Sequence, residues 1–92
     1  MTDEQAPSWS HAPKIKVERV QTGVRMEKNM LKVLKALAAY LDISLGDLLE
    51  GIVLHAFDGI PPFGDEMIAR ISKLKDVYGM EHDATASHRF VE

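Results

Sequence analysis

A single short segment with a strand-like pattern constrains the fold of this chain more than any other feature. From residue 20 to residue 26, apolar and polar side chains alternate with the period of a β-strand that has one buried face. One face carries Val20, Thr22, Val24 and Met26, and the other carries Gln21, Gly23 and Arg25. Residues 14–18 are too close to fold back on this strand without a turn sequence. Because an isolated strand leaves its backbone N–H and C=O groups unpaired, the expected partner is the same strand of a second chain.

Two amphipathic helices are expected directly after the strand, over residues 27–41 and 44–57. In both, apolar residues recur at i, i+3, i+4 and i+7, which places them on one stripe. Ser44 with Asp47 three residues on resembles a capping box that begins the second helix. The strand and the two stripes together predict the core of a dimer, made of Val20, Thr22, Val24, Met26, Met30, Leu34, Leu37, Leu48, Leu49, Ile52 and Val53.

A third amphipathic helix is expected over residues 65–79, after a linker at residues 58–64. Its apolar face has two interpretations. It packs back on the body to cover Leu54 and Phe57, which lie outside the stripe of the second helix, or it binds another protein. The sequence favours the first interpretation. The residues of this face are Met67, Ile68, Ile71, Leu74 and Tyr78.

The composition of the 92-residue chain fits one small domain, since 46% of its residues are hydrophobic. Residues 1–13 and 80–92 have no periodicity and are expected to be a flexible arm and a flexible tail. The absence of cysteine excludes disulfides and thiol nucleophiles. With no signal peptide and no apolar run near the roughly 18 residues of a membrane span, a cytoplasmic location is expected. The patterns give no account of Trp9, Ile15 or Val17.

The charge of the chain is polarised. Its net charge is -3, but residues 13–35 hold seven basic side chains against two acidic ones, a local charge of +5. Such a distribution presents one basic surface on an otherwise acidic protein. The basic side chains are Lys14, Lys16, Arg19, Arg25, Lys28, Lys32 and Lys35.

The order of strand, helix, short serine-capped turn and second helix resembles the ribbon-helix-helix (Arc/MetJ/CopG-like) family. Residues 20–26, the stripe from Met30 to Leu41 and residues 42–49 carry this resemblance. It implies a mostly α-helical chain with one β-strand, in an intertwined homodimer that shares an intermolecular two-stranded antiparallel ribbon. It also implies a sequence-specific DNA-binding protein, a transcriptional repressor that inserts the ribbon into the major groove.

The resemblance assigns base contacts to Gln21, Gly23 and Arg25. Arginine pairs with guanine and glutamine with adenine, whereas Gly23 offers no hydrogen bond and favours relaxed specificity. The alternative is that these residues are the solvated face of a strand.

Phosphate contacts are assigned to the start of the second helix at Ser44, Leu45 and Gly46, where free N–H groups favour an anion. The alternative there is a plain N-cap, and both can hold together. Further phosphate contacts are expected from four basic side chains, although lysines on the first helix are more often a solvated face and carry less weight. These four are Lys14, Lys16, Arg19 and Lys28.

No catalytic, metal or cofactor site is expected. The four histidines are scattered, and no metal-ligand spacing, glycine-rich phosphate loop or nucleophile motif occurs. The expected function is therefore a dimeric DNA-binding regulator. The alternative is an antitoxin-like dimer that binds a protein partner through residues 58–92.

Overall fold

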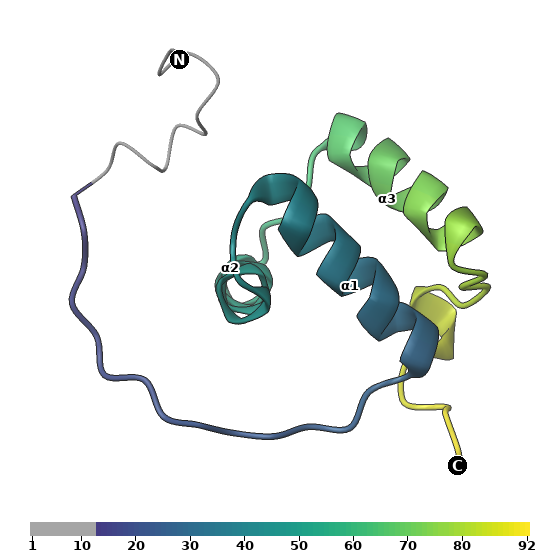
Figure 1. Ribbon diagram of the computed structural model, residues 1–92, viewed down its shortest axis with the longest axis horizontal. Helices are drawn as coiled ribbons and strands as arrows, with labels where there is room; N and C mark the ends of the chain where they lie inside the picture. The colour runs from purple at the N-terminus through teal and green to yellow at the C-terminus, as the bar shows by residue number, and fades with distance from the viewer. Residues whose placement is uncertain (1–12) are drawn as a thin grey trace.

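Within residues 13–92, three α-helices make up the regular structure, apart from one short 3-10 helix (Figure 1). The computed structural model describes residues 13–92, so the predicted arm before residue 13, Trp9 included, lies outside the described residues. Each helix begins and ends within two residues of its expected bounds. The helices are α1 at Lys28–Leu41, α2 at Leu45–Phe57, α3 at Asp65–Val77 and the 3-10 helix η3 at Ala84–Ala86.

Short-range hydrogen bonds define the ends of α1 and the start of α2. The carboxylate of Glu27 accepts hydrogen bonds from the backbone N–H groups of Asn29 and Met30, at 2.9 and 2.8 Å, and so caps α1. After Leu41 the chain turns at Asp42, whose φ of 59° lies in the left-handed region that ends many helices. Ser44 then accepts a hydrogen bond from the backbone N–H of Asp47 at 3.0 Å, as an N-cap does.

The core lies along α1, which contacts both α2 and α3. Its buried residues are Val33, Leu37 and Ala38 from α1 and Leu48 from α2. Half-buried apolar side chains pack against Leu37, Ala38 and Leu48. They are Leu34, Leu41, Ile43, Ile52, Phe63, Met67, Ile71 and Leu74. The apolar stripe of each helix therefore meets the others at one small core.

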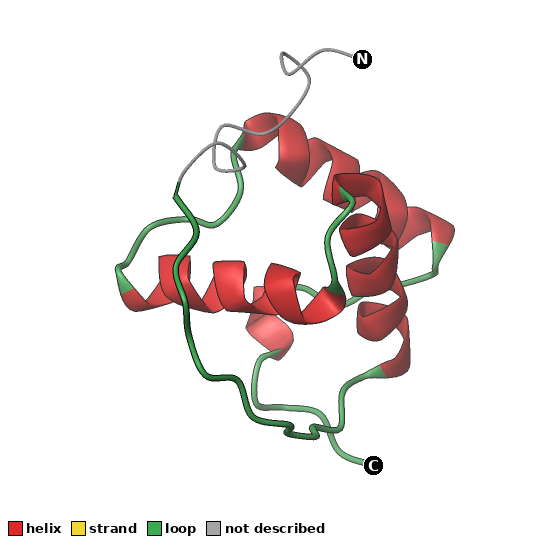
Figure 2. Cartoon of the chain, turned by 60° about the vertical axis from the view of Figure 1, so that its left-hand side comes forward, coloured by secondary structure: helices red, strands yellow, loops and turns green. Residues whose placement is uncertain are grey.

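The predicted β-strand is wrong. Residues 13–27 form an extended loop with no strand (Figure 2), and no backbone hydrogen bond among the described residues involves residues 13–26. Alternation gives a segment the side-chain pattern of a strand, but a strand also needs a neighbour to pair its backbone, and residues 13–92 provide none. The ribbon-helix-helix fold with its intermolecular ribbon is therefore corrected to three helices with an extended N-terminal segment.

The predicted dimer core is divided between the interior and the surface. Leu37 and Leu48 are buried within one chain, and Leu34 and Ile52 pack around them. The apolar residues of the expected strand are exposed instead, because the segment that carries them packs on no helix face. The exposed strand residues are Val20, Thr22 and Val24. Val53 on α2 is also exposed, while Met26, Met30 and Leu49 are half-buried.

Helix α3 packs back on the body, but it does not cover the residues expected beneath it. Met67, Ile71 and Leu74 face the core around Leu37. Leu54 and Phe57 remain 65% and 82% exposed, because α3 lies along α1 rather than over the outer side of α2 (Figure 1).

Candidate nucleic-acid interface

The basic segment, defined as residues 13–27, is almost wholly exposed. Every residue from 13 to 25 is exposed. The segment runs outside the helical body as a long loop that ends at the N-terminus of α1 (Figure 1). Side chains on both of its faces are therefore open to a partner.

One ion pair attaches the basic segment to α2. The guanidinium of Arg19 donates two hydrogen bonds to the carboxylate of Glu50, from Nε at 2.9 Å and from Nη2 at 2.7 Å. This bidentate geometry lowers the pKa of Glu50 and raises the pKa of Arg19, because each hydrogen bond favours both charged forms. The pair is exposed to solvent, so another anion can compete for Arg19.

The three predicted base-contact residues, Gln21, Gly23 and Arg25, all lie exposed on the basic segment. The guanidinium of Arg25 contacts the carboxylate of Glu92. Both arginines of the segment thus have a carboxylate partner within the chain. To contact DNA, Arg19 would have to leave Glu50, and Arg25 would have to leave Glu92.

The predicted phosphate site lies beside a hollow of about 550 Å³ between residues 18–22 and the start of α2. Arg19 and Gln21 line the hollow together with Ser44 and Gly46, and a Cβ atom added at Gly46 would meet no atom within 4 Å. Its other charged residues are all acidic. These are Glu18, Asp47 and Glu50. Three carboxylates against one guanidinium disfavour a phosphate inside this hollow. Leu45, the third residue of the predicted site, is half-buried and does not line the hollow.

The lysines of the basic block are exposed and have no ion-pair partner among residues 13–92. Lys14 and Lys16 lie on the basic segment. Lys28, Lys32 and Lys35 follow one another on the outer face of α1, opposite the buried stripe. The basic segment and α1 therefore share a run of free positive charges.

Sequence reasoning missed the two carboxylates that hold the arginines. Arg19 and Glu50 are 31 residues apart, and Arg25 and Glu92 are 67 apart. Periodicity reports neighbours within one element, so no signal in the sequence pairs residues at these separations.

Two further properties concern metal binding and membranes. Among the described residues, no three histidine, aspartate or glutamate side chains come together in a way that could hold a metal ion. In the same part of the chain, none of the helices has both the length and the apolar character needed to cross a membrane.

Comparison with known proteins assigns no family. No family model, curated protein or solved structure matches this chain. The function of the basic segment is therefore inferred from its own residues.

Proposed function

We propose that this protein is a cytoplasmic regulator of transcription that binds duplex DNA, as a dimer, through the basic segment and the lysine face of α1. The observation that carries the proposal is the accessibility of the positive block. The basic side chains of residues 13–35 are exposed, and the five lysines among them have no carboxylate partner among residues 13–92. DNA binding draws its affinity from such cations, because each phosphate contact releases a condensed counterion.

The proposed contacts follow from the chemistry of each side chain. Lys14, Lys16 and Lys28 bind phosphates, which supplies affinity without sequence information. Gln21 and Arg25 have the donors that pair with base edges, so they supply the sequence preference. An extended segment presents these side chains along a groove without needing a β-ribbon.

Dimerisation is supported by apolar side chains left in solvent. The basic segment exposes Val20 and Val24, and the end of α2 exposes Leu54 and Phe57. Among residues 13–92, four apolar residues are buried, which is a small core for a segment of this length. A second copy that covers some of these side chains would also bring two basic segments to one DNA site.

Selection from a random duplex library tests the proposal. Purified protein is used at low and moderate salt beside Arg25→Ala, with Arg70→Ala as a matched control that removes a positive charge from α3. We expect an enriched sequence, retention that falls steeply with salt, and loss of enrichment in Arg25→Ala only. If the wild-type protein retains no duplex even at low salt, DNA binding is excluded.

The second candidate, an antitoxin-like protein that binds a partner through residues 58–92, has weaker support. Met67, Ile71 and Leu74 would be the natural contact residues on α3, but they face the core. A partner could bind this face only by displacing α3 from α1.

A further inference from the structure

An apolar groove of about 540 Å³ lies between the end of α1, one face of α2 and the linker that leads into α3. Leu54 belongs to its wall and remains 65% exposed, so the groove is open to solvent. Apolar side chains that line an open groove favour an apolar occupant. The wall includes Leu41, Ile43, Ile52, Leu54, Pro62 and Met67.

The polar side chains that line this groove offer hydrogen-bond acceptors. No lysine or arginine among the described residues lines it, and Glu50 is already paired with Arg19. The carboxylate of Asp47 and the ring of His55 are the other polar groups. Nδ1 of His55 lies 2.8 Å from the carbonyl oxygen of Gly51. Because a carbonyl oxygen only accepts, Nδ1 donates, and Nε2 of the neutral ring is an acceptor.

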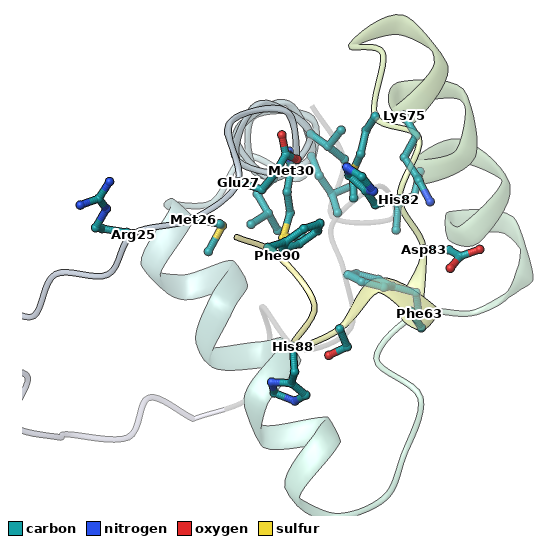
Figure 3. Close-up of a pocket in the computed structure, with 17 residues that line it drawn as sticks. Arg25, Met26, Glu27, Met30, Phe63, Lys75, His82, Asp83, His88 and Phe90 are labelled. Carbon is teal, nitrogen blue, oxygen red and sulfur yellow. The ribbon is translucent and has the colours of Figure 1, made fainter. Parts of the chain in front are cut away.

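A hollow beside α1 and α3 does not select an occupant in this way. Its volume is about 760 Å³, and its charged lining residues are of both signs. Arg25 and Lys75 line it together with Glu27 and Asp83 (Figure 3). The groove at α2 differs, because its apolar wall is combined with acceptors alone.

The chemistry of an indole matches this groove. An indole ring buries a large apolar area, and its single polar atom is an N–H donor, which finds an acceptor when the ring is buried. The floor of the groove also suits a flat ring. Gly51 lies in the middle of α2, where glycine disfavours the helix, and a Cβ atom added there would meet no atom within 4 Å. Packing within the described chain therefore gives no reason for a glycine at this position, whereas a ring lying against the helix backbone does.

The basic segment is already attached at the rim of the groove. Glu50 lines the groove and also holds Arg19, and the segment passes on the side of α2 in both views (Figures 1 and 2). Trp9 is the only tryptophan of the chain and lies ten residues before Arg19, a separation that spans up to roughly 33–36 Å when extended. The whole of α2, with 13 residues, is about 20 Å long. No backbone hydrogen bond among the described residues fixes the course of residues 13–18, so Trp9 can reach the groove.

We infer that Trp9, which precedes the described residues, binds in the groove of its own chain with its indole N–H toward Asp47 and His55. Together with the pair between Arg19 and Glu50, this contact fastens the basic segment to α2 at two points. It depends neither on DNA binding nor on a second copy of the chain.

Fluorescence of Trp9 tests the inference, since the chain has no other tryptophan. In the full chain without DNA, we expect an emission maximum blue-shifted from that of the urea-unfolded chain, and weaker quenching by acrylamide. Gly51→Leu fills the groove while it favours the helix, so the blue shift should be lost with helix content retained by circular dichroism. Ala56→Leu is the matched control, because it places the same side chain at an exposed position of α2 outside the groove. It should keep the wild-type emission.

A second variant keeps the test independent of how Gly51→Leu folds. Leu54→Asp places a charge on the groove wall at a 65% exposed position, and it should also abolish the blue shift. Wild-type emission equal to that of the unfolded chain would overturn the inference. So would a blue shift that survives in both groove variants, or one that Ala56→Leu abolishes as well. A blue shift that disappears on dilution would place Trp9 in the groove of a second copy and would overturn binding within one chain.

Discussion

At the scale of single residues, the carboxylates around the basic segment are the least expected feature of the protein. Glu50 pairs with Arg19 and Glu92 pairs with Arg25, the two arginines of the proposed DNA-binding segment. Both pairs are exposed, so they hold the arginines weakly. Under the proposed function, these carboxylates would compete with DNA phosphate for the two arginines.

Glu50→Gln tests this competition. Removal of the carboxylate frees Arg19, so we expect duplex affinity to rise by roughly two- to five-fold, the range that corresponds to an exposed ion pair. Fluorescence anisotropy with a labelled duplex measures the change. Asp76→Asn on α3 is the control with the same change of charge, and an equal gain there would point to net charge instead of Arg19.

Glu27 predicts a pH effect on stability. Hydrogen bonds from the backbone of Asn29 and Met30 lower the pKa of Glu27 below its ordinary value. A lowered pKa stabilises the fold above the pKa of the unfolded chain, and this contribution disappears as the pH falls through the lower, folded pKa. Glu27→Gln should therefore unfold at lower urea than the wild type at pH 7, and the difference should vanish in acid. Glu18→Gln, on the exposed basic segment, should match the wild type at both pH values.

At the scale of elements, α1 organises the fold because its stripe meets both other helices. Leu37 is 2% exposed and lies at the centre of the core. We expect Leu37→Ala to lower the free energy of unfolding by about 2–5 kcal/mol, the cost of a buried leucine and its cavity. Ile15→Ala, at an 85% exposed position, should change it by less than about 0.5 kcal/mol. Urea unfolding measures both, and equal effects would contradict this core.

Helix α3 is structural in this fold, because Met67, Ile71 and Leu74 cover one side of the core. A chain truncated after Gly59 should therefore lose cooperative thermal unfolding, which circular dichroism detects. A truncated chain that melted like the full protein would show that α3 is dispensable. It would then favour the partner-binding interpretation of residues 58–92.

At the scale of the whole molecule, the chain combines an acidic net charge with one accessible basic block. If Lys16 binds a phosphate, Lys16→Ala should reduce the slope of log affinity against log salt by about 1. Lys73→Ala on α3 should leave the slope unchanged. Titrations of one duplex at several salt concentrations distinguish the two. Equal slopes for all proteins would place the phosphate contacts elsewhere.

The sequence by itself determined the three helices and their approximate bounds. Helix hydrogen bonds join residues four apart, so periodicity, the Ser44 cap and Gly79, whose φ is 67°, report helix ends locally. It also indicated that Gln21 and Arg25 belong to an accessible segment.

Only the tertiary structure decided the rest. Whether residues 20–26 pair as a strand, where α3 packs, and which carboxylate meets Arg19 all depend on groups far apart in the sequence. An alternating pattern states which side chains share a face, but it does not supply a backbone partner. The stripe of α3 likewise shows that a face is apolar without stating which helix it meets. The linker and the core bring distant helices together, and this determines which helix α3 meets. A pattern among neighbouring residues contains no information on such contacts.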